Sequence, residues 1–500
     1  MKAGFFSDII VSILSKRGDI MEYVLYAVLA VVAIPVLLLL AAVLRTALMK
    51  TKKADYVPNP DPKRTDEYVS KLSEMVQYET ISKRGEVNTE KFLGFHKVLE
   101  KLFPTVHEKL EKTEIDGNLL FKWKGKSSEK PILIMSHQDV VEATGDWKYP
   151  PFSGEVAEGK VWGRGTSDTK CTVMAFLQAA EELLKEGYTP DCDVYIASSC
   201  TEEIGGDGAP KIVDYLDKQG VKLFLVCDEG GGIIQDPMAG IKGNFAMVGV
   251  FEKGYGDVKF IARSTGGHAS APPKNTPIAR LSKFVAQVDK KNPFNVEFMP
   301  EVEAMFSKLA PYAGFGLRLI FGNLWLFKPL MKKLLPMISA QAGAMLSTTI
   351  AFTMSEGSNG YNVIPQEASI CANMRYIPHQ GTDESLEVIT NLAKKYNIET
   401  EVVYKGYPSP CVDINGEAFK MVETAINECF PGVGCSPYVV TGATDARFYS
   451  KICDSCVRFA PVIYGPEQMK GMHGLNENIE CNTLQGAVDF YKKIITMQKR

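Results

Sequence analysis

The longest apolar run of the chain lies near its N-terminus. Residues 23–44 read YVLYAVLAVVAIPVLLLLAAVL and include no charged residue. About 20 apolar residues in a helix cross the ~30 Å hydrocarbon core of a bilayer, and a proline such as Pro35 is tolerated there. The pattern therefore predicts a transmembrane helix over 23–44, preceded by an N-terminal segment, 1–22. A buried core helix and a cleaved signal peptide, whose apolar region is usually only ~7–15 residues long, are the alternatives.

The residues that follow this run are first basic and then rich in proline. Residues 45–62 read RTALMKTKKADYVPNPDP, a composition typical of a spacer. This side of the apolar run carries four lysines and arginines, and the segment 1–22 carries three besides the α-amino group. Excess positive charge favours the cytoplasmic side, but this small difference does not decide the orientation. We therefore expect a single-pass membrane protein, with the side of its main domain left open.

Beyond residue 62, short apolar runs alternate with helical patterns. Apolar positions recur with helical spacing in three segments, Thr65–Tyr78, Glu90–Leu102 and Asp168–Glu186. Three short apolar runs predict buried strands, namely Pro131–Met135, Asp193–Ser199 and Leu223–Cys227. Because helical segments separate these strands, we expect a mainly parallel sheet in an α/β domain. Each run ends in polar residues, at the edge where open α/β sheets usually hold their functional sites.

The pattern changes from about Val248. Val258–Ala262 alternates, Asn373–Tyr376 and Thr400–Tyr404 indicate further strands, and Asp383–Tyr396 indicates a helix. We therefore expect a smaller α+β unit over 249–409, inserted into a domain formed by residues 63–248 and 410–500.

An apolar stretch lies within this second unit, between Phe294 and Met345. It includes Phe315–Phe321 and Leu324–Phe327. Two interpretations remain open. The stretch is either ordinary core of the unit, or an exposed apolar surface or groove for an acyl chain.

Composition removes several classes of protein. The 500 residues are 45% hydrophobic and 23% charged, which is ordinary for a folded protein. A net charge of −3 gives no basic field, so we expect no nucleic-acid partner. Eleven cysteines are odd in number and too dilute for a disulfide scaffold. Cys453-x-x-Cys456 has no second such pair and so does not predict a structural zinc site.

Two imidazoles and three carboxylates follow apolar runs or adjoin glycines, and they are candidate metal ligands: His137, Asp168, Glu203, Asp228 and His473. Such a set suits borderline divalent ions, zinc first and then cobalt or manganese. Five ligands exceed the need of one catalytic zinc ion. They suit two ions ~3.5–4 Å apart that share one carboxylate.

Two more carboxylates adjoin these ligands. Asp139 lies two residues after His137, on the same face of an extended strand, where it could hold the imidazole N–H. Glu202 precedes Glu203. Because adjacent side chains point in different directions, one of these two could bind metal while the other accepts a proton from water. Taken alone, each pair is more often an ordinary surface feature.

Longer motifs carry a family resemblance. SHQDVV, GRGTSDTK, TEEIGG, CDEGG, STGGHAS and MHGLNE, in this order, resemble the M20 family of metallo-carboxypeptidases and aminoacylases, from about residue 66 to the C-terminus. GDWKYPPFSGEVAEGKVWGRGTSD, GHASAPPK, NLWLF and NVIP resemble its carboxypeptidase S branch, which includes the N-fatty-acyl-amino-acid synthase/hydrolases. The resemblance implies a zinc-exopeptidase-like α/β/α catalytic domain with an inserted ferredoxin-like lid domain, here preceded by one transmembrane helix.

The resemblance also implies a role for each metal ligand. Asp168 would bridge two zinc ions, His137 and Asp228 would complete one site, and Glu203 and His473 would complete the other.

Further motif residues would act on the water and the substrate. By the same resemblance, Glu202 would be the general base and Asp139 the acid that orients a ligand. In the lid, His268 would donate to the developing oxyanion, Asn362 would face the substrate, and Arg375 would hold its free carboxylate. In dimeric relatives the histidine comes from the partner subunit, which makes a homodimer through the lid domain an open expectation.

The loop 441–447 resembles the family's loop for the substrate carboxylate. Here it reads TGATDAR, with alanine at positions 443 and 446, where family members often have Gly or Asn and Ser. Backbone contacts from Gly442 and Thr444 are therefore the expected substrate contacts. His96, His107 and His379 match no motif, and we expect them at the surface.

Together these features predict a membrane-anchored di-zinc hydrolase that cleaves an amide bond next to a free carboxylate. The substrate would be a small peptide or an N-acyl amino acid, and the apolar stretch and the anchor favour the second. A non-catalytic metal- or ligand-binding protein on the same scaffold is the alternative. The loss of any ligand would have favoured that alternative, and all five are present.

Overall fold

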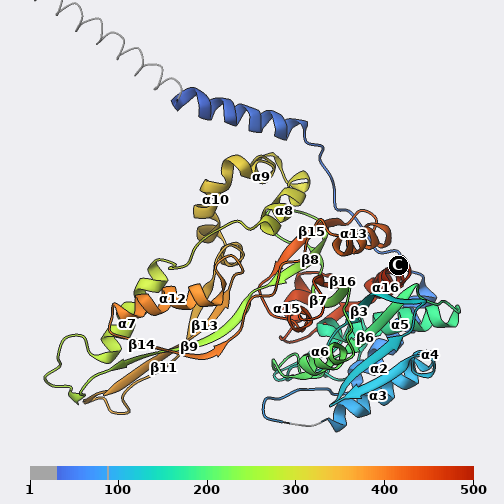
Figure 1. Ribbon diagram of the computed structural model, residues 1–500, viewed down its shortest axis with the longest axis horizontal. Coiled ribbons are helices and arrows are strands. Elements are labelled where there is room, and N and C mark those ends of the chain that lie inside the picture. Colours follow the sequence, from blue (N-terminus) through green and yellow to red (C-terminus); the bar gives the residue numbers. More distant parts are fainter. Residues whose placement is uncertain (1–30, 87–88) are drawn as a thin grey trace, which may run out of the picture.

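The computed structural model describes residues 31–86 and 89–500 (Figure 1). Among them, one helix, Val31–Leu48, is long and apolar enough to cross a membrane, and 11% of it is buried. The predicted span over 23–44 falls partly on this helix. The first part of the predicted span, residues 23–30, and the segment 1–22 lie outside the described residues. A signal sequence near the N-terminus has the same properties, so a membrane span remains a prediction.

An eight-stranded sheet forms the centre of the larger unit, in the order β1-β2-β6-β3-β7-β16-β8-β15. Its strands are β1 (Glu111–Ile115), β2 (Asn118–Trp123), β3 (Ser127–Met135), β6 (Cys192–Ser198), β7 (Leu225–Gln235), β8 (Asn244–Glu252), β15 (Gly434–Val440) and β16 (Cys456–Tyr464). β3 pairs in parallel with β6 and β7, β7 with β16, and β8 with β15. The expected parallel pairing therefore holds at the centre, whereas β2 is antiparallel to both of its neighbours.

Helices cover both faces of this sheet. Alternate residues of β3 enter different apolar clusters, Ile132 and Ile134 on one face and Leu133 and Met135 on the other. The first face is covered by α2 (Pro62–Gln77), α3 (Glu90–Leu102), α4 (Pro104–Lys109), α5 (Cys171–Lys185), α13 (Glu417–Cys429) and α16 (Leu484–Met497). The second is covered by α6 (Gly208–Lys218) and α14 (Ala446–Tyr449). This is a three-layered α/β/α arrangement.

The segment around Asp168 differs from its prediction as the start of a helix. α5 begins only at Cys171, after the irregular turn Thr166–Lys170. Within this turn Asp168 has an extended backbone, with φ −125° and ψ 84°. Gly165, at φ +87°, reverses the chain just before it, a conformation that glycine adopts without strain. The carboxylate of Asp168 therefore projects from a turn at the end of the sheet.

A second, four-stranded antiparallel sheet is built from the inserted residues 254–405. Its order is β11-β13-β9-β14, where β9 is Gly254–Arg263, β11 Thr349–Glu356, β13 Glu367–Tyr376 and β14 Glu399–Lys405. Helices α7 (Pro277–Lys290) and α12 (Gly381–Lys394) pack on one face through a separate apolar cluster. The chain order β9-α7-β11-β13-α12-β14 is that of a split βαβ unit of the ferredoxin type. A short ribbon of β10 (Gly267–His268) and β12 (Val363–Ile364) extends from it.

The apolar stretch between Phe294 and Met345 forms four helices between α7 and β11. These are α8 (Pro300–Leu309), α9 (Phe315–Phe321), α10 (Leu324–Ile338) and α11 (Ala340–Ala344). α8 packs against β15 and joins the core of the large sheet, not that of the inserted unit. α9 and α10 lie beside the N-terminal helix in Figure 1. The stretch therefore divides into a buried part and a part with exposed apolar side chains.

His96 corrects the expectation of a surface position. Its side chain is only 1% exposed, and Nδ1 lies 2.9 Å from Glu114 Oε1. The apolar spacing of α3 carries this imidazole inward together with Phe95 and Leu99.

Candidate metal centre and substrate cavity

His137 follows β3 and is held in one orientation by the chain around it. It is 2% exposed, and its Nδ1 lies 2.9 Å from the backbone carbonyl of Asp139 and 3.5 Å from that residue's Oδ1. Nε2 then points to Asp168 Oδ1, 3.1 Å away. Burial alone would lower the pKa of His137, but the Asp139 and Asp168 carboxylates raise it well above its usual value.

Asp139 also fixes the loop that follows β6. Its carboxylate accepts hydrogen bonds from the backbone N–H groups of Glu202 and Glu203, both at 3.2 Å. The hydroxyl of Ser82 donates to it at 2.6 Å. Asp139 therefore positions both His137 and the Glu202–Glu203 pair.

Asp168 stands between the two predicted imidazole ligands, His137 and His473. Its Oδ1 lies 3.1 Å from His137 Nε2, and its Oδ2 lies 3.0 Å from His473 Nε2. His473 Nε2 is also 3.0 Å from Glu203 Oε2. Burial would raise the pKa of Asp168, but the two imidazoles hold it well below its usual value. These four residues, from four separate segments, form one cluster.

Glu477 holds the Asp168 turn in place. Its buried carboxylate accepts hydrogen bonds from the backbone N–H groups of Gly165, Ser167 and Asp168 at 2.9–3.0 Å. It also forms an ion pair of 2.6 Å with Arg164. Sequence reasoning missed this role, although Glu477 lies only four residues after His473 in the same motif.

The predicted ligand Asp228 makes its hydrogen bonds to backbone N–H groups and not to the other predicted ligands. Its Oδ1 accepts the N–H of Glu229 at 2.8 Å, and its Oδ2 accepts the N–H of Ala446 at 2.7 Å, so its carboxylate serves the start of α14. Burial and the nearby Asp445 carboxylate raise its pKa to about 7. The metal contact of Asp228 remains a prediction.

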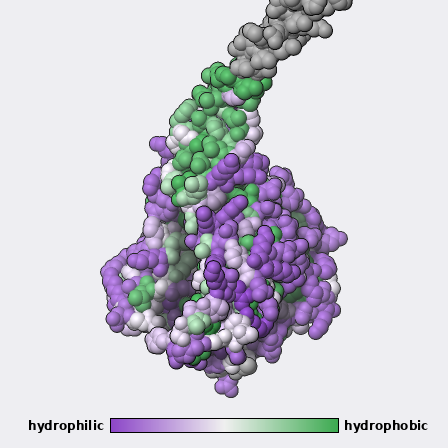
Figure 2. All heavy atoms as spheres, turned by 90° about the vertical axis from the view of Figure 1, so that its left-hand side faces the viewer, coloured by the Kyte–Doolittle hydropathy of each residue, from purple (hydrophilic) through white to green (hydrophobic). Residues whose placement is uncertain are grey.

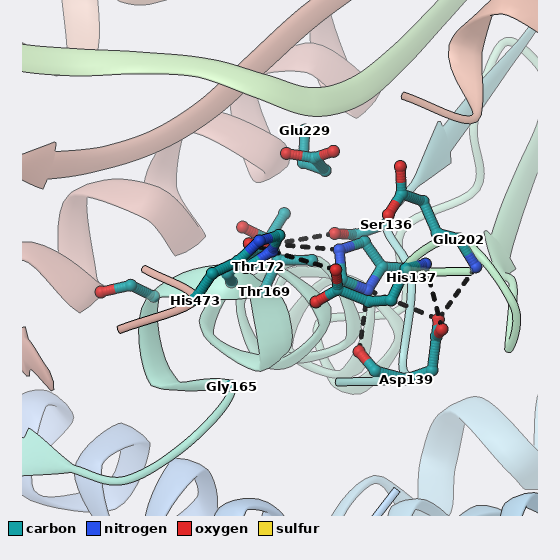
Figure 3. A network of polar contacts seen from close by, with 12 residues as sticks. Ser136, His137, Asp139, Gly165, Thr169, Thr172, Glu202, Glu229 and His473 are labelled. Carbon is teal, nitrogen blue, oxygen red and sulfur yellow. Dashed lines mark hydrogen bonds and ion pairs between the residues drawn. The ribbon is translucent and has the colours of Figure 1, made fainter. Parts of the chain in front are cut away.

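Glu229, the next residue, lies beside the cluster (Figure 3). Burial raises its pKa well above the usual value, and Asp168 and Glu203 are among the charges that add to this effect. Adjacent residues of a strand point to opposite faces. The alternation that separates Glu202 from Glu203 also separates Asp228 from Glu229, and so it indicates Glu229 as a candidate ligand.

The donor set fits divalent cations. Ligand atoms of His137, Asp168 and Glu203 all lie within 4.8 Å of one another. Two ligands of a tetrahedral zinc ion, each about 2.0–2.2 Å from it, lie roughly 3.3 Å apart, close to the 3.0–3.1 Å between the imidazoles and Asp168. Glu203 Oε1 is buried and has no hydrogen-bond partner among the described residues. Burial also raises the pKa of Glu202 and Glu203, as expected for carboxylates whose charge needs a cation.

The cluster opens onto a cavity of about 910 Å³ between the large sheet and the inserted unit. Glu202, Glu203 and His473 line one part of it. Arg375, predicted to hold the substrate carboxylate, lines another part together with Arg447. Burial lowers the pKa of Arg375, and the charge of Arg447 contributes. Two guanidinium groups thus face the same space as the metal ligands.

The 441–447 loop contributes differently from its prediction. Gly442 lines the cavity, as expected. Thr444 does not, because it is 2% exposed and its N–H donates to the buried carboxylate of Glu252. The N–H of Thr444 is therefore already occupied, and its substrate contact remains a prediction. Arg447, which sequence reasoning did not single out, lines the cavity from the same loop.

His268 and Asn362 lie together but away from the cluster. They come from the β10–β12 ribbon, where the N–H of Ala269 donates to the carbonyl of Asn362 at 2.9 Å. Both side chains are exposed, and neither is among the described residues that line the cavity. Within one chain, the ribbon therefore leaves these two predicted substrate contacts apart from Glu202.

Comparison with known proteins gives consistent matches. The pattern of the peptidase family M20/M25/M40 matches residues 133–497. The N-fatty-acyl-amino acid synthase/hydrolase PM20D1 of Xenopus tropicalis is 34% identical over 93% of this chain and 92% of its own length. A probable carboxypeptidase S-like 2 of Dictyostelium discoideum is 31% identical over 86% of this chain and 84% of its own length. The M20 family metallo-carboxypeptidase Sso-CP2 of Sulfolobus solfataricus has the same fold, with a TM-score of 0.63 at 21% identity over 86% and 98% of the two chains.

Proposed function

This chain belongs to the peptidase family M20/M25/M40, and from that premise we propose that it is a membrane-anchored two-metal hydrolase that cleaves an amide bond next to a free carboxylate. One observation carries the proposal. The cavity that contains Glu202, Glu203 and His473 also contains Arg375 and Arg447. A substrate carboxylate on the guanidinium groups would therefore share this space with its scissile amide at the acidic cluster.

Five side chains would hold the ions: His137, Asp168, Glu203, Glu229 and His473. Zinc is the preferred metal for such ligands, with cobalt or manganese as alternatives. When bound, the ions would polarise the scissile carbonyl and make a water molecule acidic. The two oxygens of Asp168, each directed to a different imidazole, support a bridging role.

Glu202 is the proposed general base. Its backbone is fixed by Asp139, and no hydrogen bond to its carboxylate occurs among the described residues. It lines the cavity and is free to accept a proton from water and to pass it to the leaving nitrogen. Gly442 borders the same cavity without a side chain, which leaves room beside Arg447 for a substrate carboxylate.

His268 and Asn362 would reach this site from a second copy of the chain. Their exposure on the β10–β12 ribbon supports a homodimer formed through the inserted unit. In that arrangement the imidazole of His268 would donate to the developing oxyanion.

The preferred substrate is an N-acyl amino acid with a long apolar acyl group. The exposed apolar side chains of α9 and α10 and the likeness to an N-fatty-acyl-amino acid synthase/hydrolase support this choice. A small peptide is the second candidate, favoured by the likeness to a probable carboxypeptidase S-like protein. Since a catalyst acts in both directions, the same site would also condense an acid and an amine.

N-oleoyl-leucine and glycyl-leucine separate these candidates, because they share the leaving amino acid and differ only in the acyl part. We expect the zinc-loaded full chain in detergent to hydrolyse N-oleoyl-leucine with at least tenfold higher kcat/KM. A preference for glycyl-leucine would support the peptidase, and no turnover of either would overturn the proposal.

Glu202→Gln tests the mechanism. A general base contributes about 10²–10⁴ in rate, so kcat should fall by that factor while the metal content stays unchanged. Asp207→Asn, at an exposed position of the same loop, is the matched control and should keep full activity. Wild-type kcat in Glu202→Gln would refute this role.

A further inference from the structure

Helices α9 and α10 present apolar side chains to the outside of the molecule. Six large side chains between residues 315 and 338 are 41–81% exposed: Phe315, Trp325, Leu330, Leu334, Met337 and Ile338. The opposite side of α10 is anchored in the core through Leu324, Met331 and Leu335. Both sides of this helix are therefore apolar, which is unfavourable for a helix that faces only water.

The same segment carries cations and no acids. Residues 304–355 include no Asp or Glu and five basic residues. Lys308 and Lys328 form ion pairs with glutamates, but Arg318, Lys332 and Lys333 form none among the described residues. Two guanidinium nitrogens of Arg318, Nε and Nη1, are buried without a hydrogen-bond partner there. Apolar side chains beside unpaired cations are typical of helices that lie in the interface of an anionic membrane.

The loop between α9 and α10 is fixed to the end of the N-terminal helix. Asn323 is fully buried, and its Nδ2 donates to Thr46 Oγ1 at 2.9 Å and to the carbonyl of Ala42 at 3.3 Å. Further along the chain, the N–H of Lys52 donates to the carbonyl of Pro311 at 2.9 Å. Figure 2 shows the apolar surface of the N-terminal helix continuing onto the top of the globular part. Because Ala42 lies near the end of the predicted span, this contact sets α9 and α10 at the level of the membrane surface.

We propose that α9 and α10 form a second membrane-contact surface, which lies on an anionic bilayer beside the anchor. The exposed apolar side chains enter the boundary between headgroups and acyl chains, where a tryptophan such as Trp325 is favoured. Lys332 and Lys333 contact lipid phosphates. This inference rests on the membrane anchor of the proposed function.

The surface is also connected to the cavity. Lys253, at the junction of β8 and β9, donates from Nζ to the carbonyls of Ala344, the last residue of α11, and Ser347, which follows α11. Lys253 lines the same cavity as Glu202. An amphiphilic substrate dissolved in the bilayer would therefore meet the enzyme on the side whose helical segment is hydrogen-bonded to Lys253 of the cavity wall.

Trp325 reports directly on this contact. We would insert the full chain into vesicles of phosphatidylcholine and phosphatidylglycerol that contain lipids brominated near the headgroup, and compare it with Trp325→Phe. The other tryptophans of the chain belong to the sheet domain, and Trp123 and Trp162 are buried. We expect bromolipids to quench a fraction of the wild-type fluorescence that Trp325→Phe lacks. If the vesicles retain both proteins after carbonate washing but bromolipids quench them equally, the surface contact of α9 and α10 is overturned. The membrane anchor is not overturned by that result.

Charge reversal provides the second test. Lys332→Glu with Lys333→Glu should reduce quenching and lower kcat/KM for vesicle-bound N-oleoyl-leucine at least fivefold, while turnover of a short, soluble N-hexanoyl-leucine stays unchanged. The matched control is Lys394→Glu with Lys395→Glu on α12, which reverses two adjacent exposed lysines elsewhere. Identical behaviour of both double variants would refute the proposal. Release of the wild-type chain by carbonate would refute the anchor, and a membrane-bound chain that hydrolyses neither substrate would refute the proposed activity instead.

Discussion

Glu477→Gln is the sharpest test of how the site is assembled. The substitution preserves size but replaces one carboxylate oxygen by an amide nitrogen. Glu477 is fully buried, where it accepts three backbone N–H groups and pairs with Arg164. In the variant, the amide NH2 of the introduced glutamine would face N–H donors that a carboxylate oxygen now accepts. Arg164 would keep its buried positive charge without a counter-ion.

The magnitude follows from these contacts. Breaking a buried ion pair costs about 3–5 kcal/mol. Arg164 also donates to the carbonyl of Gly474 at 2.8 Å, so its N–H groups stay partly satisfied. We therefore expect a loss of about 3 kcal/mol in the free energy of unfolding. Because the Asp168 turn loses at least one N–H acceptor whichever way the amide is oriented, zinc affinity should also fall by about 10–100-fold.

Urea unfolding in the presence of EDTA measures the first effect without a contribution from bound metal. Dialysis against buffered zinc, followed by elemental analysis, measures the second. Glu467→Gln is the matched control, since Glu467 makes an exposed ion pair with Lys160 that is worth at most about 1 kcal/mol. If the two variants do not differ in either measurement, Glu477 does not hold the Asp168 turn.

Three further predictions concern the cluster. Elemental analysis should find about one metal ion per chain in Glu229→Ala. Asp228→Asn should keep two ions and lose only stability, and the reverse result would identify Asp228 as the ligand. In the metal-free chain, burial raises the pKa of Asp228 to about 7 and of Asp445 to about 6, so the folded state binds protons more tightly than the unfolded state. The urea midpoint in EDTA should therefore fall as the pH rises from 5.5 to 7.5, and a rising midpoint would contradict this assignment. If His268 acts in the partner subunit, mixing inactive His268→Ala with inactive Glu202→Gln should restore up to about a quarter of wild-type activity; no restoration after confirmed subunit exchange would exclude a shared site.

Local sequence predicted the elements well where the pattern was strong. The helix over Glu90–Leu102 and the buried strand that ends at Met135 have the expected positions. Their apolar periodicity is a local property, so it survives without knowledge of the fold. The start of α5 was predicted three residues too early, because the left-handed glycine that bends the Asp168 turn has no periodic signal.

Side-chain direction is the property of the site that local sequence leaves open. Asp228 and Glu229 are adjacent carboxylates at the same strand, and only the pairing of β7 with β3 and β16 decides which one faces the cluster. Thr444 stands in a motif, but its N–H is taken by Glu252, which lies 192 residues earlier in the chain. Contacts over such distances leave no trace in local spacing.

The sequence by itself determined the chemistry of this protein. The residue types, their order and their motifs predicted the M20 family, which the comparisons confirm, together with the carboxylates and imidazoles that suit two divalent ions. Only the fold brings Asp168 between His137 and His473, Glu229 beside this cluster, and Arg447 to the cavity that Arg375 lines. The physical reason is that a ligand's identity is a property of one residue. Its position instead depends on strand register, turn geometry and buried hydrogen bonds between segments that are hundreds of residues apart.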